Sequence, residues 1–215
     1  VVQMGNFGPD FYSVAEDPEV ARSLCGMPVV GIEPNLALAA QLIPQVRDAG
    51  ARVVGQLSMT LYFGDHEAGL GLFGPVWEQM WTPAILGTAP ADSVTEAAAL
   101  TDGAPSRRII EGRPYFTCRG CIANPVWLTT LKAMVTKGID LGLQGFNATH
   151  NYEGFCGYTH CAGAIRRHLE GEHGLRPEEL RILFGGNLDQ IDDLRQPDAE
   201  APEPLRRRFA SVLEQ

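Results

Sequence analysis

The stretch that decides the fold runs from residue 28 to residue 59 and reads PVVGIEPNLALAAQLIPQVRDAGARVVGQLSM. Its opening, residues 28–32, is an apolar run between turn residues, which predicts a buried strand. Asn35 can cap a helix whose apolar residues recur at helical spacing and which stops at Gly50. Residues 51–59 then predict another strand. Strands that alternate with helices indicate parallel strands joined by right-handed crossovers.

The same alternation extends in both directions along the chain. Residues 1–7 predict a strand before this stretch, and residues 141–146 predict a fourth strand after a helix that begins at Asn124-Pro125. Residues 61–115 lack a long period and predict an extended loop. Loops this long in a compact domain are usually functional or disordered, and the two tryptophans in this one argue against disorder.

These patterns predict an α/β fold, a (β/α) barrel of the TIM type with about four βα units present. Residues 1–215 are expected to form a single barrel-type domain, truncated at the C-terminus. A doubly wound open sheet is the structural alternative. No G-x-G-x-x-G motif follows the first strand, which disfavours the nucleotide-binding forms of that alternative.

Composition excludes several classes of partner. The formal net charge is −9 and the pI is about 5.0, so the chain repels phosphate backbones and nucleic acid is not expected as a partner. No run approaches the ~20 apolar residues of a membrane span. The chain opens without an initiator Met, which leaves the compartment open, and a secreted or periplasmic location is favoured over the cytoplasm.

Three acids stand at the ends of predicted strands or in the loops that follow them: Glu33, Asp65 and Glu153. In a parallel α/β fold such positions meet at one edge of the sheet. Glycoside hydrolysis needs two carboxyl groups that flank one bond, so these three are the candidate catalytic residues. Each taken alone is better explained as an exposed or helix-capping acid.

The loops after the third and fourth predicted strands carry aromatic, amide and imidazole side chains that suit a sugar ring. Aromatic faces stack on C–H surface while polar groups fix hydroxyls. The candidate substrate-binding residues are Tyr62, His66, Trp77, Trp81, Asn147, His150, Asn151 and Tyr152. The alternatives are tryptophans that anchor a long loop and polar side chains that bond their own backbone.

Four of the five cysteines form two close pairs, Cys118 with Cys121 and Cys156 with Cys161. Two such pairs resemble a tetrathiolate zinc site, so one interpretation of these cysteines is a structural zinc ion. Disulfides, thiols and a redox Cys-x-x-Cys pair are the others. No further cofactor is expected.

Three motifs resemble one protein family. Cys121–Trp127 (CIANPVW) resembles a cysteine-x-asparagine-asparagine-proline-x-tryptophan signature, with Ala123 at the first asparagine. Gly138–Asn147 (GIDLGLQGFN) looks like the strand GVDGIFFDN, and Cys156–Cys161 (CGYTHC) resembles a C-x-C-x-H-C motif with Tyr158 at the middle cysteine. The chain thereby resembles the front half of poorly characterised bacterial barrel proteins related to glycoside hydrolases, of the β-galactosidase-like and α-fucosidase-like kinds.

The resemblance implies a (β/α)8 barrel that acts on or binds carbohydrate. In fucosidase-like members a strand-end aspartate is the nucleophile, and Asn147 stands at that position here. The first hypothesis is a glycosidase, and the second is a carbohydrate-binding or degenerate hydrolase barrel without catalysis. A third is an interaction domain stabilised by cysteine-bound zinc. An isolated half barrel would leave strand edges unpaired, which predicts a homo-oligomer.

Overall fold

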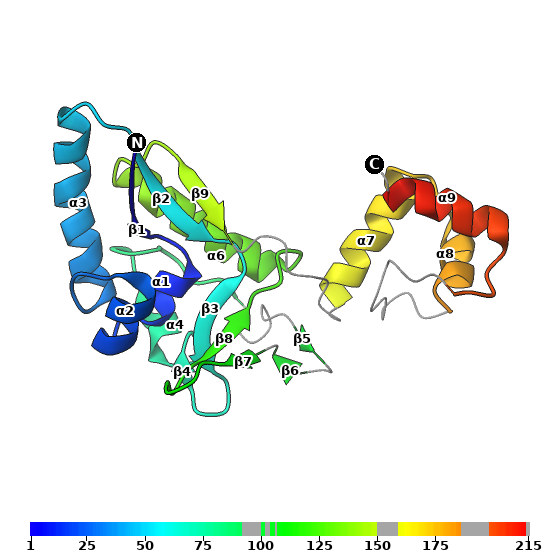
Figure 1. Cartoon of the computed structure of the whole chain (residues 1–215), viewed down its shortest axis with the longest axis horizontal. Helices are drawn as coiled ribbons and strands as arrows, with labels where there is room; N and C mark the ends of the chain where they lie inside the picture. The colour runs from blue at the N-terminus through cyan, green and yellow to red at the C-terminus, as the bar shows by residue number, and fades with distance from the viewer. Residues whose placement is uncertain (92–99, 102–103, 106, 150–158, 186–197, 214–215) are drawn as a thin grey trace. The chain divides into compact units, whose positions relative to one another are not determined.

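The computed structural model describes residues 1–91, 100–101, 104–105, 107–149, 159–185 and 198–213. The chain divides into two compact units (Figure 1). The first comprises Val1–Ala98 and Pro105–Glu153, and the second comprises Ala99–Ala104 and Gly154–Gln215. Each unit is described by itself.

The first unit holds most of the strands. They are β1 (Val2–Asn6), β2 (Val53–Ser58), β3 (Leu61–Asp65), β4 (Leu70–Gly71), β7 (Arg107–Ile109), β8 (Phe116–Arg119) and β9 (Phe146–Thr149). Its helices are α1 (Pro9–Ser13), α2 (Pro18–Cys25), α3 (Ile32–Asp48), α4 (Pro75–Met80) and α6 (Pro125–Asp140). The short strands β5 (Leu100–Thr101) and β6 (Ala104–Pro105) pair only with each other among the described strands.

One sheet is parallel and has the order β1-β2-β9. Val2 of β1 pairs with Val53, and Gly55 of β2 pairs with Phe146. Burial alternates along β2, where Val53, Gly55 and Leu57 face the core. Helices α3 and α6 lie in the two connections, and because right-handed crossovers progress in one direction here, they cover the same face of the sheet.

The second sheet is antiparallel, with the order β4-β3-β8-β7. Strand β3 begins three residues after β2 ends, and Leu61 pairs with Arg119 of β8. A tight turn after Asp65 leads back into β4. The segment 61–115, which is expected from the sequence to be a loop, contributes three of the four strands of this sheet, so that expectation is wrong.

The predicted TIM barrel is also wrong. The strands that the structure describes form a three-stranded parallel sheet and a separate four-stranded antiparallel sheet, and they close no barrel. The error has a physical cause. The sequence interpretation treats residues 61–115 as a loop inserted in a βα rhythm, whereas residues 61–65 start an antiparallel strand directly after β2.

The predicted strand at 28–32 is absent, and Ile32 begins α3 instead. Gly31 has a φ of 95°, a left-handed conformation that suits glycine and interrupts a strand. Asn35, the expected helix cap, lies inside the helix and donates from Nδ2 to the carbonyl oxygens of Val29 and Gly31. The amide thus holds this segment as a turn. The predicted cap at Asn124, in contrast, is confirmed, since its side chain accepts from Val126 N at 2.8 Å.

Trp127 of α6 is the centre of the first core and is fully buried. Its Nε1 donates to the carbonyl oxygen of Met59 at 2.8 Å, just beyond β2. Its ring lies 5.2 Å from that of Tyr62 on β3. Gly120, at the end of β8, lies directly against the indole ring. One side chain therefore contacts elements of both sheets.

The second unit has a small helical core of its own. Its helices are α7 (Thr159–Gly171), α8 (Pro177–Leu183) and α9 (Glu203–Leu213). Phe184 packs edge-on against Phe209 with ring centroids 5.3 Å apart. Arg208 of α9 reaches Glu179 of α8 at 3.3 Å.

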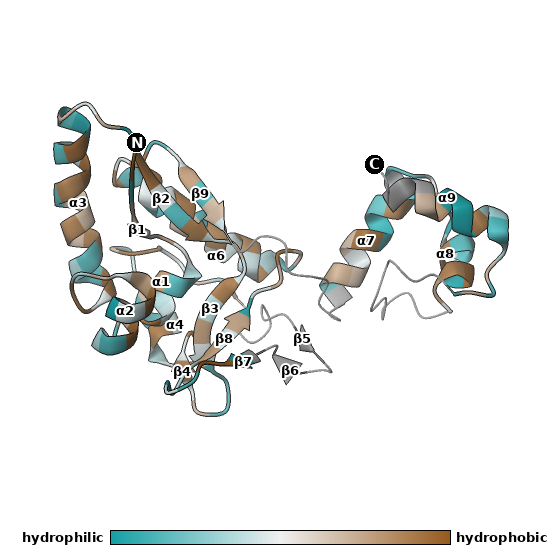
Figure 2. Cartoon of the chain, viewed as in Figure 1, coloured by the Kyte–Doolittle hydropathy of each residue, from teal (hydrophilic) through white to brown (hydrophobic). Residues whose placement is uncertain are grey.

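Figure 2 shows hydrophilic residues alternating with hydrophobic ones along α3, and a largely hydrophilic α9. Among the described helices, none combines the length and apolar character that a membrane crossing requires.

We predict that Gly120→Ala lowers the free energy of unfolding of the first unit by about 2 kcal/mol or more, because an added Cβ would overlap the Trp127 ring and force it to move. All three tryptophans lie in this unit, so denaturant unfolding followed by tryptophan fluorescence reports on it alone. The matched control is Gly5→Ala, where a Cβ meets nothing within 4 Å, with an expected change within about 0.5 kcal/mol. Equal stability of the two variants would contradict the central role of Trp127.

Candidate functional site

Three amide side chains line the face of the parallel sheet that points away from the apolar core. Gln3 pairs in register with Val54, and Gln56 pairs with Asn147. Side chains alternate along strands, so these amides share the face opposite to Val53. Gln3 and Asn147 are exposed, and Gln56 is half-buried.

The three amides form a hydrogen-bonded ladder across the sheet. Gln3 Nε2 donates to Gln56 Oε1 at 3.0 Å, and Asn147 Nδ2 donates to Gln3 Oε1, also at 3.0 Å. The ladder has a direction and leaves unlike groups at its ends. Gln56 keeps its Nε2 donor and Asn147 keeps its Oδ1 acceptor for a further partner. Since these two residues are paired across adjacent strands, a donor and an acceptor lie side by side on the open face.

The polar face continues toward the C-terminal edge of the sheet, where it becomes buried. Ser58 pairs with Thr149 in register, and Ser58 is fully buried. Thr149 Oγ1 is buried and has no hydrogen-bond partner within the described part of the chain. Asp10 of α1 is also buried. A Cβ at Gly8 would lie 2.9 Å from Asp10 Oδ1 and 2.6 Å from Ser58 N, so glycine at this position allows the Asp10 carboxylate to approach the end of β2.

Sequence reasoning found Asn147 but missed Gln3, Gln56 and Asp10. A signal for two of them was present. Gln56 directly precedes the apolar residue Leu57, so the two side chains point to opposite faces of the strand. Gln3 stands at a similar position in the first strand, and the alternation indicates a polar outer face. Asp10 follows the first strand within Gly-Pro-Asp, a strand-end position of the kind used to select the other acids.

Glu33, a predicted catalytic acid, does not end a strand. It lies exposed in the first turn of α3. It lines an open surface pocket together with Gln79 and Thr82. Thr82 Oγ1 is buried there and has no hydrogen-bond partner within the described residues.

Asp65 has a structural role at the end of β3. Its Oδ1 accepts from the backbone N–H groups of Glu67 and Ala68 at 2.9 and 3.3 Å, which builds the turn into β4. His66 is exposed, and its ring lies edge-on to Phe73 at 5.4 Å. The residues named around Asp65 differ from those that line the pocket beside Glu33.

The predicted aromatic residues lie in or against the core. Tyr62 is fully buried between Phe73 and Trp127. Trp77 and Trp81 pack edge-to-face at 5.6 Å, and both are partly buried against the core. The alternative interpretation, in which the tryptophans anchor this segment, agrees with these contacts.

Five predicted site residues lie outside the described residues: His150, Asn151, Tyr152, Glu153 and Cys156. The remaining cysteines of the zinc prediction belong to different units. Cys118 and Cys121 are buried in the first unit, and Cys161 is half-buried on α7 in the second. Cys118 Sγ lies 3.6 Å from the carbonyl oxygen of Gly64.

In the part of the chain that the structure describes, no three His, Cys, Asp or Glu side chains converge as metal ligands. Because Cys156 is outside that part, the four-cysteine zinc site stays a prediction.

Two buried tyrosines have strongly perturbed acidity. Burial raises the pKa of Tyr12 well above its ordinary value of 10.0. Burial, followed by the nearby Cys118 thiol, raises the pKa of Tyr62 in the same direction. Neither hydroxyl has a hydrogen-bond partner within the described residues. An unsatisfied buried hydroxyl costs free energy, so these groups do not stabilise the fold through their oxygens.

We predict that the first unit loses stability as the pH rises above about 10. In that range the unfolded tyrosines have released their protons while Tyr12 and Tyr62 keep theirs, so the folded state binds more protons and a further rise in pH favours unfolding. Tyrosinate absorbance should show a late phase that coincides with the change in tryptophan fluorescence.

Tyr12→Phe and Tyr62→Phe should each remove part of that late phase. At neutral pH each variant should keep the free energy of unfolding within about 0.5 kcal/mol or raise it, since no hydrogen bond is lost. A loss of about 2 kcal/mol in either variant would show that its hydroxyl has a partner.

Comparison with known proteins identifies no function for this site. No family model, no curated protein and no solved structure matches the chain. The resemblance to glycoside-hydrolase barrels is therefore a prediction that rests on the motifs alone.

Proposed function

We propose that this chain binds carbohydrate on the amide ladder of Gln3, Gln56 and Asn147. The observation that carries the proposal is the adjacent donor and acceptor that the ladder leaves on the open face of the sheet. A vicinal diol is complementary to this pair. One hydroxyl accepts from Gln56 Nε2, and its neighbour donates to Asn147 Oδ1.

The surroundings of the pair suit a sugar. Val54 lies on the same face as Gln56 and is half-buried, so it offers apolar surface to the C–H groups of a ring. The ladder bonds hold two amides in place before a ligand arrives, which reduces the entropy lost on binding.

Binding is a better supported function than hydrolysis. Hydrolysis by the usual route needs two carboxyl groups about 5–10 Å apart across one bond. Glu33 lies in the first turn of α3 beside an open pocket, and Asp65 is engaged in a turn. Glu153, the third candidate, is outside the described residues.

The test is a binding measurement with the full chain. Soluble oligosaccharides that present vicinal diols would be titrated by calorimetry or by ligand-observed NMR. Asn147→Ala and Gln56→Ala should each weaken binding about fivefold or more, because each removes one hydrogen bond to the ligand.

The matched control is Gln45→Ala on α3. Gln45 is also an exposed amide, and its Nε2 donates only within its own helix, to the carbonyl oxygen of Gln41 at 3.0 Å. This variant should bind as the unmodified chain does. If no oligosaccharide binds, or if all three variants bind alike, the proposed site is wrong.

A further inference from the structure

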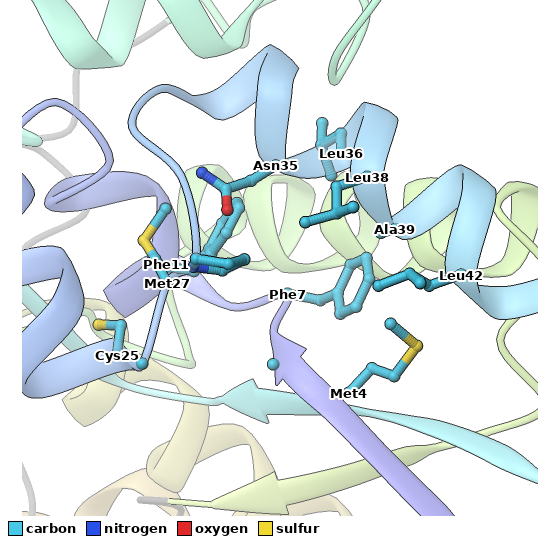
Figure 3. A pocket seen from close by; sticks show the side chains of 13 residues that line it. Met4, Phe7, Phe11, Cys25, Met27, Asn35, Leu36, Leu38, Ala39 and Leu42 are labelled. Carbon is cyan, nitrogen blue, oxygen red and sulfur yellow. The ribbon is translucent and has the colours of Figure 1, made fainter. Parts of the chain in front are cut away.

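A second site lies on the other side of the parallel sheet, between β1, α3 and the segment that follows α2. It is a pocket of about 120 Å³, and its walls are almost entirely apolar. Figure 3 shows the side chains gathered around it. Its principal apolar walls are Met4, Phe7, Phe11, Met27, Leu38 and Leu42. None of the described residues that line this pocket is charged.

One polar group enters this apolar wall. Asn35 is only 6% exposed and lines the pocket. Its Nδ2 donates to the carbonyl oxygens of Val29 and Gly31 at 2.5 and 2.7 Å, so both amide hydrogens are used. Figure 3 shows its nitrogen and its oxygen pointing in different directions, with the oxygen on the side of Phe11. Within the described residues Oδ1 accepts no hydrogen bond.

The walls define the chemistry of an occupant. A dry apolar cavity of about 150 Å³ holds a benzene molecule, so the space here suits a single ring. Met4, Met27 and Cys25 place three sulfur atoms around the pocket, and sulfur makes favourable contacts with aromatic rings. The absence of charged lining residues favours a neutral ligand. Asn35 Nδ2 is engaged with backbone carbonyl oxygens, so Oδ1 is the atom of this amide that can accept a hydrogen bond, which favours a ligand that carries one donor.

We propose that this pocket binds a small neutral aromatic molecule that carries one hydrogen-bond donor, with phenol as the simplest example. The ring lies among Phe7, Phe11 and Met27, and the hydroxyl donates to Asn35 Oδ1. The site is separate from the amide ladder, since the pocket includes Met4, which pairs with the core-facing Gly55. It does not depend on the proposed carbohydrate function.

The first test compares two ligands of equal size. Phenol and toluene differ by a hydroxyl in place of a methyl group, so both fill the pocket but only phenol can donate to Asn35. Titration of the full chain, followed by ligand-observed NMR, should show phenol binding at least fivefold more tightly than toluene. Equal or tighter binding of toluene would overturn the role of Asn35, and failure of both to bind would overturn the site.

The second test fills the pocket without touching Asn35. Ala39 lies on α3 and lines the pocket, whereas Ala40 is exposed on the same helix and does not. Ala39→Phe should reduce phenol affinity at least tenfold, and Ala40→Phe should leave it unchanged. Retained binding in Ala39→Phe would place the ligand elsewhere. If phenol does not bind and sedimentation shows a dimer that Ala39→Phe dissociates, the pocket belongs to a second copy of the chain, and the proposal fails.

Discussion

The indole of Trp127 is the contact on which the first unit depends. Trp127 lies on α6, and its Nε1 donates to the backbone at Met59, just beyond the parallel sheet. Its ring also packs on Tyr62 of the antiparallel sheet. Both sheets are small, with three and four strands, and sheets of this size need a hydrophobic face or a helix packed against them to be stable. A large buried aromatic ring with its N–H satisfied supplies that surface. Gly120 is required because the ring occupies the space of its side chain.

The parallel sheet separates two kinds of chemistry. On one face, Val53 and Leu57 pack into the core beneath α3 and α6. On the other face, amide side chains from the three strands donate to one another at 3.0 Å. The crossover helices α3 and α6 do not cover this face, so the amides satisfy one another there. Period-2 alternation produces both faces from the same strands. A polar ligand and an apolar ligand can therefore have sites on one sheet without competing for the same side chains.

The sequence allowed the helices to be predicted better than the sheets. Apolar spacing and a cap at Asn124 determine α6 locally, so its start was found. The antiparallel sheet depends instead on pairing between β3 and β8, whose partners Leu61 and Arg119 lie far apart in sequence. No local pattern specifies such pairing. The amide ladder was missed for the same reason, since Gln3 and Asn147 meet only after the strands are ordered, although the alternation that exposes Gln56 was visible.

The failure at residues 28–32 has a more specific cause, and it also explains the apolar pocket. Val29 and Val30 have the composition of a strand, and a strand there would have extended the sheet beyond β1. Asn35 competes for the same backbone by bonding the carbonyl oxygens of Val29 and Gly31 from within α3, and the left-handed Gly31 completes the turn. Among the described strands, β1 consequently pairs only with β2. The space beside β1 is bounded by helix α3 instead of being filled by a neighbouring strand, and Asn35, which bonds the backbone of this turn, also supplies an amide to the pocket that results.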